Sequence, residues 1–319
     1  AKALKPYLRQ FLSDKRVIDY PKWLWYPILF GIILRTRPPK SAKAYASVWD
    51  PEGAPLLVGS DRLAKKAMHR LHEVLPADQL PAGEIPYAVG MRYGTPSIDA
   101  ALTQLERKGV ERILVLPLYP QYSATTTASI FDAVGDALKH RTWVPEIRTI
   151  NEYYLFPGYI EALAASVREH WATHGEPDRL LMTFHGIPVR YCRTNDPYRP
   201  HCEATARRLA HALNLADDRW IITFQSRFGP ETWLQPYTDK TLEKWGEEKL
   251  GRVDTICPGF SIDCLETLEE IAIEGKEEFE ESGGGELTYI PCLNDRDDHA
   301  QVMSDLIRSN LGGWLPAPE

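Results

Sequence analysis

Short apolar segments alternate along this chain with longer segments in which apolar residues recur every three or four positions. The apolar segments expected to form strands are 55–59, 87–91, 112–118, 179–184, 220–224, 253–257 and 287–290. The segments with helical periodicity between them are 62–75, 97–108, 127–139, 158–174, 202–213 and 263–281. Strands that alternate with helices of this length form parallel sheets covered on both faces. The pattern therefore predicts an α/β fold.

A short internal repeat divides the chain into two halves. Gly90-Met-Arg-Tyr-Gly-Thr-Pro96 is similar to Gln225-Ser-Arg-Phe-Gly-Pro230, and each copy is followed by a helical segment and a strand that ends at a proline. We therefore expect two equivalent lobes, 1–145 and 146–295, that face one cleft, with a helix at 296–310 joining the first lobe. The first lobe begins directly in a helical segment, so its first strand is expected to be missing from this sequence.

Composition and charge narrow the class of protein. The 319 residues are 44% hydrophobic and 25% charged, which is typical of a globular protein long enough for two compact lobes. The net charge of −7 argues against a nucleic-acid partner, because phosphate-binding faces gather Lys and Arg. The five cysteines are widely spaced and form no Cys-X-X-Cys pair, which argues against a disulfide framework, a zinc ribbon and an iron–sulfur cluster. We expect a cytoplasmic protein.

The longest apolar run is Trp23-Leu-Trp-Tyr-Pro-Ile-Leu-Phe-Gly-Ile-Ile-Leu34, with Lys22, Arg35 and Arg37 close to its ends. Its 12 residues are too few to cross a bilayer, which takes about 20 apolar residues. Three interpretations stay open: a core helix with charged ends, a helix lying in a membrane interface, and an apolar wall for a flat ligand. The second would place the protein at the periphery of the inner membrane.

Two candidates for chemistry follow predicted strands. His185 comes directly after the strand at 179–184, and the carboxyl ends of parallel strands are where such sheets bind ligands. Glu266, Glu270 and Glu274 recur every fourth residue after a later strand, so one helix face would carry all three. Carboxylates in this spacing repel one another, which is better explained if a cation passes along the row. The alternatives are a structural histidine and a solvated acidic face. If both candidates act together, they suit a divalent metal such as Fe²⁺ and the uptake of protons.

Other side chains at the predicted strand ends suit a flat ligand that carries carboxylates at its edge. Arginines could pair with such carboxylates through two hydrogen bonds, while aromatic and small polar side chains could line the remaining surface. These candidates are Arg37, Arg92, Tyr119, Tyr122, Ser123, Gln225, Ser226, Phe228 and Trp233. Any one of them could equally be structural, and only their recurrence at successive strand ends favours a ligand site.

Several of these segments resemble the signature motifs of ferrochelatases, the enzymes that insert ferrous iron into a porphyrin. They are Phe184-His-Gly-Ile-Pro188, Leu118-Tyr-Pro-Gln-Tyr-Ser123, Thr223-Phe-Gln-Ser-Arg-Phe-Gly-Pro230 and Cys257-Pro-Gly-Phe-Ser-Ile-Asp-Cys-Leu-Glu-Thr-Leu-Glu-Glu-Ile271. Phe11-Leu-Ser-Asp14 and Trp25-Tyr-Pro-Ile-Leu-Phe-Gly-Ile-Ile-Leu34 are similar too, so the resemblance covers nearly the whole chain in the family's order. It implies the chelatase fold, in which two Rossmann-like lobes have parallel four-stranded sheets flanked by helices.

The resemblance also implies roles for particular residues. His185 matches the family's active-site histidine and Glu266 matches its glutamate, so these two are the expected catalytic metal ligands. Glu270 is expected to act with them, as part of an acidic row that conducts metal or protons. The expected porphyrin-binding residues are Arg37, Arg92, Tyr122, Ser123, Gln225, Ser226 and Trp233. The apolar run 23–34 matches the lip of the porphyrin pocket.

The expected reaction converts protoporphyrin IX and Fe²⁺ into protohaem and two protons, with no cofactor beyond the substrate metal. Coproporphyrin is an alternative substrate, and two other functions stay open: a cobalt chelatase that acts on another tetrapyrrole, and a tetrapyrrole-binding protein without catalysis. A nucleotide-binding Rossmann protein fits less well, because no Gly-X-Gly-X-X-Gly motif follows a predicted strand. The expected partners are therefore the porphyrin, ferrous iron and, through 23–34, a membrane surface.

Overall fold

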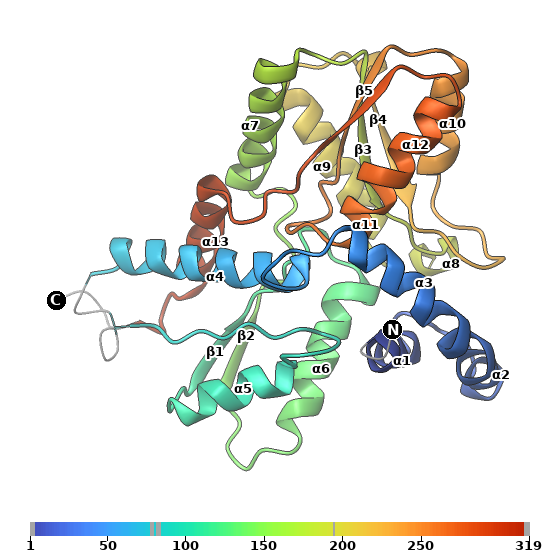
Figure 1. Ribbon diagram of the computed structural model, residues 1–319. Coiled ribbons are helices and arrows are strands. Elements are labelled where there is room, and N and C mark those ends of the chain that lie inside the picture. The colour runs from blue at the N-terminus through green and yellow to red at the C-terminus, as the bar shows by residue number, and fades with distance from the viewer. Residues whose placement is uncertain (1–3, 77–79, 81–83, 194, 316–319) are drawn as a thin grey trace.

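The computed structural model describes residues 4–76, 80, 84–193 and 195–315, and it shows an α/β protein with two separate parallel sheets (Figure 1). The strands are β1 (Arg112–Val115), β2 (Glu146–Thr149), β3 (Arg179–His185), β4 (Trp220–Gln225), β5 (Arg252–Ile256) and β6 (Glu286–Ile290). The α-helices are α1 (Leu4–Ser13), α2 (Lys22–Ile28), α3 (Leu34–Ser47), α4 (Pro55–Val74), α5 (Ile98–Arg107), α6 (Ser129–Leu138), α7 (Pro157–His174), α8 (Val189–Cys192), α9 (Tyr198–Ala212), α10 (Thr238–Glu247), α11 (Leu265–Leu268), α12 (Lys276–Glu281) and α13 (Asp297–Asn310). Three π-helical segments, η1 (Leu29–Ile33), η4 (Ala124–Ala128) and η6 (Glu270–Gly275), and the 3₁₀ turn η5 (Asp217–Arg219) complete the description.

The larger sheet has the strand order β4-β3-β5-β6, with all neighbours parallel. Its central strand β3 alternates between two apolar cores, as a strand buried on both faces must. Leu180, Met182 and Phe184 pack in the core that contains α7 and α9, whereas Leu181 packs in the core of α10 and α12. The sequence prediction of a parallel sheet covered on both faces is confirmed for this half.

The smaller sheet consists of β1 and β2, which pair in parallel. Ile113 packs with apolar residues of α5 and α6, and the next residue, Leu114, packs on the other face near α4 and α13. Helix α4 lies between the two sheets, because Leu63 and Ala67 share one core with both Leu114 and the residues of β3 (Figure 1). The two sheets are therefore packed together through α4 and do not form one continuous sheet.

The first half differs from the sequence prediction in several elements. The segment 55–59, expected to be a strand, is the first turn of α4, where Pro55 occupies a position that tolerates a missing N–H. The segment 87–91 makes a single bridge, from Met91 to Ser97, and no strand. Strand β2 was missed, because Glu-Ile-Arg-Thr contains only one apolar residue. As a result, the described residues form two strands in this half where three were expected.

The first helices form a separate unit, the helical cap, made of α1, α2, η1 and α3 (residues 4–47). Its apolar residues pack mainly on one another, and Phe228 is the contributor from the rest of the described chain. Within the apolar run 23–34, Trp25 and Leu29 are buried, whereas 79% of Trp23 and 59% of Ile32 remain exposed. The run is therefore half core and half surface. Among the helices of the described residues, none has the length and apolar character that a bilayer crossing requires.

The C-terminal helix α13 packs against both α4 and α7. This contact agrees with the expectation that a helix near 296–310 returns to the first lobe, since α4 precedes the smaller sheet in the chain. The lobe boundaries at 145 and 295 stay predictions from the sequence.

Candidate active site

The carboxyl ends of β3 and β4 place His185 beside Gln225, because these two residues are register partners in the sheet. The Nδ1 atom of His185 lies 2.6 Å from the carbonyl oxygen of Gly186. Since a carbonyl can only accept, Nδ1 carries the proton and Nε2 of the neutral ring keeps its lone pair. The hydroxyl of Tyr198 donates to the His185 carbonyl at 2.9 Å and holds the backbone at this point. The imidazole is thus oriented with one basic nitrogen available.

The loop between β5 and α11 is held by the buried carboxylate of Asp263. This carboxylate accepts hydrogen bonds from the hydroxyls of Thr267 and Tyr289 at 2.9 and 2.6 Å, and from the side-chain amide of Asn294 at 2.7 Å. Asn294 in turn accepts the backbone N–H of Asp263 at 2.8 Å. Because Thr267 lies in the first turn of α11, this network fixes the helix that carries Glu266.

Glu266 lies next to the Gln225 side chain and to three tyrosines. The Gln225 amide donates to the backbone carbonyl of Glu266 at 2.6 Å, which connects the ends of β4 and α11. Burial raises the pKa of Tyr45 to about 12, and the negative charge of Glu266 adds to this rise. Burial also raises the pKa of Tyr7 and Tyr119, and the same carboxylate contributes to both. Two of these phenols, Tyr7 and Tyr45, belong to the helical cap, so the cap lies within range of the Glu266 charge.

Glu270 is bound by the turn that follows β4. The backbone N–H of Ser226 donates to its carboxylate at 2.6 Å, and the Ser226 hydroxyl makes a second, short hydrogen bond to the other oxygen. Ser226 adopts a left-handed backbone conformation with φ of 64°, which turns its N–H toward this carboxylate. Burial raises the pKa of Glu270, while the Ser226 hydrogen bonds and the nearby His185 oppose the rise. The structure therefore brings His185, Gln225, Ser226, Glu266 and Glu270 together.

The acidic row does not follow one regular helix as expected. The segment 263–281 is divided into α11, the π-helix η6 and α12, so the row changes pitch at Glu270. The N–H of Glu274 bonds to the carbonyl of Glu269, five residues earlier. Such π-helical turns add a residue to the helix turn and recur at functional sites. Their effect here is that Glu266 and Glu270 face the strand ends while Glu274 is exposed.

Arg92 is already engaged by its neighbours. Its Nη2 donates to Asp14 at 2.5 Å and its Nε donates to the hydroxyl of Ser129 at 2.6 Å. The expected two-bond pairing with a ligand carboxylate through this edge of the guanidinium is therefore not open. Burial raises the pKa of Tyr119, and the positive charge of Arg92 opposes this rise.

Arg37 and Trp233 lie around the same aromatic ring, that of Phe228. The guanidinium of Arg37, an exposed residue, stacks over this ring at 5.6 Å from its centre. Trp233 is buried with its ring centre 5.1 Å from that of Phe228, and it packs closely against Gly186. These residues form one wall between the helical cap and the turns after β3 and β4.

Tyr122 and Ser123 lie at the start of η4, beyond the end of β1. Ser123 is buried, and its hydroxyl donates to the carboxylate of Asp196 at 3.0 Å. Asp196 also accepts the N–H of Ala124 at 2.7 Å. The Ser123 hydroxyl is thus used to join the two halves of the chain, while Tyr122 stays half-buried beside it.

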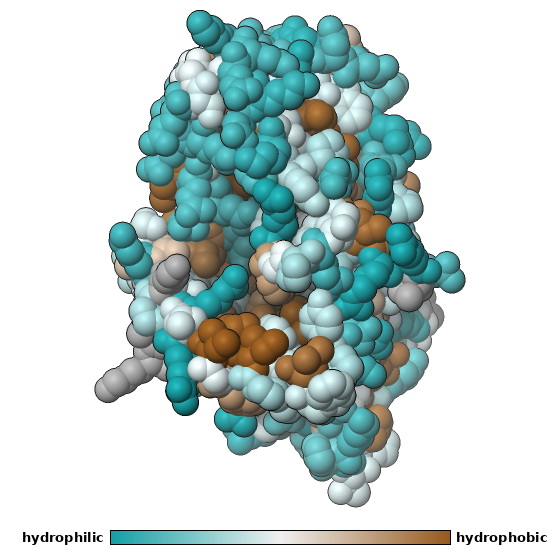
Figure 2. All heavy atoms as spheres, turned by 90° about the vertical axis from the view of Figure 1, so that its right-hand side faces the viewer, coloured by the Kyte–Doolittle hydropathy of each residue, from teal (hydrophilic) through white to brown (hydrophobic). Residues whose placement is uncertain are grey.

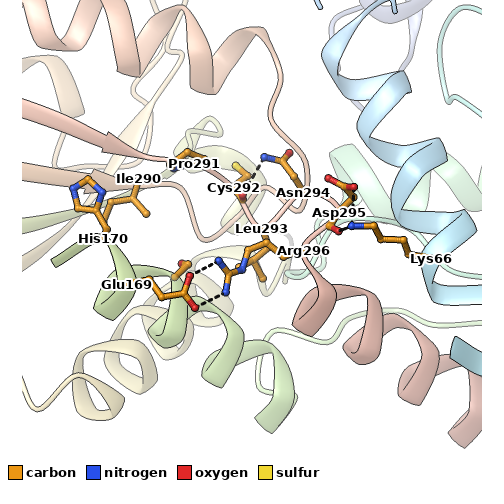
Figure 3. Close-up of a pocket in the computed structure, with 11 residues that line it drawn as sticks. Lys66, Glu169, His170, Ile290, Pro291, Cys292, Leu293, Asn294, Asp295 and Arg296 are labelled. Atoms are coloured by element: carbon orange, nitrogen blue, oxygen red, sulfur yellow. Dashed lines mark hydrogen bonds and ion pairs between the residues drawn. The ribbon is translucent and has the colours of Figure 1, made fainter. Parts of the chain in front are cut away.

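A cavity of about 530 Å³ lies elsewhere, between α4, α7 and the loop from β6 to α13 (Figure 3). Its charged residues are paired: Arg296 makes two hydrogen bonds to Glu169, and Lys66 forms an ion pair with Asp295. None of the predicted site residues lines this cavity. Asn294 lines this cavity, and its side-chain amide also donates to Asp263. The cavity therefore borders the loop that holds α11 and Glu266.

Sequence reasoning missed several residues that surround the candidate site. Tyr7 and Tyr45 come from the helical cap, and no spacing in the sequence relates them to Glu266. Asp263 and Asn294 are joined across 31 residues. Asp14 closes the motif Phe11-Leu-Ser-Asp14, and this motif was the one available signal for it.

Comparison with known proteins bears on the fold and the family of the chain. A SirB structure from Bacillus subtilis with Fe³⁺ is similar in fold, with a TM-score of 0.52 and 12% identity over 79% of this chain and 89% of that one. A ferrochelatase of Thioalkalivibrio sulfidiphilus is 51% identical over 316 residues, which are 99% of this chain and 84% of that protein. A ferrochelatase of Aromatoleum aromaticum is 51% identical over 320 residues, 100% of this chain and 86% of that protein. Because the sequence profile named Ferrochelatase also matches residues 1–311, the chain belongs to the ferrochelatase family.

Proposed function

We propose that this chain inserts Fe²⁺ into protoporphyrin IX, and that His185, Glu266 and Glu270 carry the reaction. Membership of the ferrochelatase family supports the activity over a cobalt chelatase or a carrier without catalysis. The single observation that supports this site is that the turn after β4 binds the residues proposed to act in it. Gln225, the register partner of His185, donates to Glu266, and the next residue, Ser226, binds Glu270.

Insertion must remove two protons from the pyrrole nitrogens while four nitrogens bind the metal. The free Nε2 of His185 is the base that takes up a pyrrole proton, since Nδ1 is held by the Gly186 carbonyl. Glu266 is the oxygen ligand that delivers the metal. An imidazole and a single carboxylate bind Fe²⁺ too weakly to retain it, which suits a metal that is transferred. Glu270 accepts protons from His185 and passes them toward the exposed Glu274.

The porphyrin enters between the helical cap and the strand ends in this proposal. Arg37, Phe228 and Trp233 form one wall there, and Arg92 stands on the side of Tyr119. Tyr122, Gln225 and Ser226 border the same space. Protoporphyrin IX is the proposed substrate, and coproporphyrin, which carries carboxylates on all four rings, is the competitor to be tested beside it.

The proposal is tested by following the loss of porphyrin fluorescence when Fe²⁺ is added without oxygen. The wild-type chain should metallate protoporphyrin IX, and His185→Ala should lose at least about 100-fold in kcat, the range for loss of a positioned base. His140→Ala, which changes an exposed histidine far from the strand ends, is the matched control. A His185→Ala chain that turns over at the control rate would remove this residue from the mechanism.

We further propose that the protein is cytoplasmic and touches a membrane surface through the exposed face of the helical cap. Trp23, Leu24, Ile28, Phe30 and Ile32 all expose at least 40% of their surface. Figure 2 looks onto the side of the molecule where α2 lies and shows apolar side chains gathered in one patch. Basic residues lie beside this run in the chain, as in helices that rest in lipid headgroups.

This surface proposal is tested by flotation with vesicles that contain anionic lipid. Wild-type protein should float with the vesicles, and Trp23→Ser with Ile32→Ser should stay at the bottom of the gradient with unchanged kcat for a detergent-dispersed porphyrin. The pair Trp143→Ser and Val144→Ser, which removes exposed apolar residues elsewhere, is the control. Equal flotation of both double variants would refute the assignment.

We also propose that the enzyme needs no cofactor beyond its metal substrate. A cluster ligand must be a thiolate, and burial raises the pKa of Cys202, Cys257, Cys264 and Cys292. Protein purified without oxygen should contain no stoichiometric acid-labile sulfide and no absorption near 400 nm. Stoichiometric sulfide would contradict this proposal.

A further inference from the structure

The carboxylate of Asp14, at the end of α1, is a buried acceptor for four donors. Only 7% of its side chain is exposed. One oxygen accepts hydrogen bonds from Arg92 Nη2 at 2.5 Å, from the Ser129 hydroxyl at 2.5 Å and from the Tyr93 hydroxyl at 2.8 Å. The other oxygen accepts the backbone N–H of Arg16 at 2.8 Å. Asp14 therefore connects the helical cap to the turn after residue 90 and to α6.

This arrangement fixes the orientation of Arg92. Ser129 accepts from Nε and donates to Asp14, so Arg92, Ser129 and Asp14 form a closed ring of hydrogen bonds. The guanidinium also lies over the ring of Tyr93, 4.6 Å from its centre. Among the residues that the structure describes, no acceptor is bonded to Nη1. Asp14 and Ser129 therefore occupy the edge between Nε and Nη2, and the edge that carries Nη1 faces away from them.

Arg92 connects this closed set of hydrogen bonds with the proposed active site. Burial raises the pKa of Tyr119, the charge of Glu266 adds to this rise and the charge of Arg92 opposes it, so both charged groups act on the same phenol. A guanidinium at this place can meet a negatively charged edge of a substrate that occupies the same space. Asp14 offsets much of the positive charge of Arg92. The strength of the contact with a carboxylate therefore depends more on how the N–H groups of Arg92 are oriented than on its net charge.

We infer that Asp14 is a positioning residue for substrate binding, because it holds Arg92 so that the guanidinium edge carrying Nη1 meets a carboxylate of the porphyrin. This inference rests on the proposed function. It assigns Asp14 no contact with the substrate or the metal, and it leaves the carboxylate contact of Arg92 to the edge that carries Nη1, because Asp14 and Ser129 occupy the edge between Nε and Nη2. A carboxylate recognised in this way should matter for KM and leave the chemical step unchanged.

The test compares two substrates that differ only in their carboxylates, protoporphyrin IX and its dimethyl ester, with Zn²⁺ as the metal. For Asp14→Asn we expect KM for protoporphyrin IX to rise about tenfold, kcat to change by less than twofold, and KM for the ester to stay within twofold of the wild-type value. Ser129→Ala, which leaves Asp14 in place and removes the Nε partner of Arg92, should shift KM in the same direction by a smaller factor. Asp14→Glu should restore part of the lost affinity.

Asp132→Asn is the matched control, because Asp132 pairs with Arg16 at 2.7 Å in the same corner of the molecule without touching Arg92. It should leave both KM values unchanged. An equal rise of KM for both substrates in Asp14→Asn, or a fall in kcat alone, would show a general structural role and overturn the inference. If Asp14→Asn does not fold, Ser129→Ala decides by the same comparison. A wild-type chain that fails to metallate either porphyrin refutes the proposed function, whereas an active wild type with an unaffected Asp14→Asn refutes only this inference.

Discussion

Ser226 binds the carboxylate of Glu270 with both its backbone N–H and its hydroxyl, although 44 residues separate the two in the chain. The left-handed backbone of Ser226 makes this possible, since it turns the N–H out of the direction of β4. A half-buried carboxylate is thus held at the point where a strand end and a π-helix meet.

Glu270→Gln should increase the stability of the fold at alkaline pH. Burial raises the pKa of Glu270, so its contribution to stability is present below the pKa of about 4.5 of an unfolded glutamate and is lost as pH rises through the folded value. Each unit of that rise corresponds to about 1.4 kcal/mol. Thermal unfolding at pH 8 should show a higher Tm for the variant, and the difference should shrink toward pH 4. A constant difference across this range would contradict the assignment of the raised pKa.

Glu266→Gln should abolish metal insertion while the porphyrin still binds. The amide keeps the volume of the side chain and loses the charge that a divalent metal requires, and the backbone contact from Gln225 is unaffected. We expect kcat with either Fe²⁺ or Zn²⁺ to fall at least about 100-fold, which corresponds to about 3 kcal/mol. Quenching of tryptophan fluorescence measures porphyrin binding independently. Glu274→Gln, an exposed member of the same row, should lose much less activity.

The stability of the protein should fall as pH decreases from about 6.5 to about 4, because of His299. Burial lowers the pKa of this histidine to about 4, while its Nδ1 stays bonded to the Asn294 carbonyl at 2.6 Å. In this window the unfolded chain binds a proton that the folded chain does not, which costs up to about 3 kcal/mol. Guanidinium unfolding midpoints of wild type and His299→Gln should converge as the pH is lowered. The exposed control His140→Gln should follow the wild-type profile at every pH.

Asp263→Ala should destabilise the protein by about 3 kcal/mol or more. The substitution leaves the hydroxyls of Thr267 and Tyr289 and the amide of Asn294 without their shared acceptor in a buried place. Since the network holds α11, activity should fall together with stability. A double-mutant cycle with Asn294→Ala should show strong coupling, because each residue binds the other through two hydrogen bonds. Additive effects would mean that the two residues act separately.

Much of the second half was predictable from the sequence. The run 179–184 is apolar because the central strand β3 is buried on both faces, and such burial leaves no polar alternation. The shorter runs at 220–224, 253–257 and 287–290 correspond to β4, β5 and β6. The same kind of apolar run led to a wrong prediction at 55–59, which was expected to be a strand and is the first turn of α4. Periodicity over five residues cannot separate these cases, and only the packing of α4 against α13 shows which one applies.

By itself the sequence determined the α/β class, the family and the residues that stand at strand ends, since these depend on local patterns and on motifs of adjacent residues. The tertiary structure decided which of those residues share a site and what each is free to do. The Ser123 hydroxyl donates to Asp196, and the guanidinium of Arg92 is oriented by its hydrogen bond to Asp14, which lies 78 residues away in the chain. The physical reason is that hydrogen bonds between distant residues depend on how the lobes and the helical cap are placed, and no spacing along the chain encodes that placement directly.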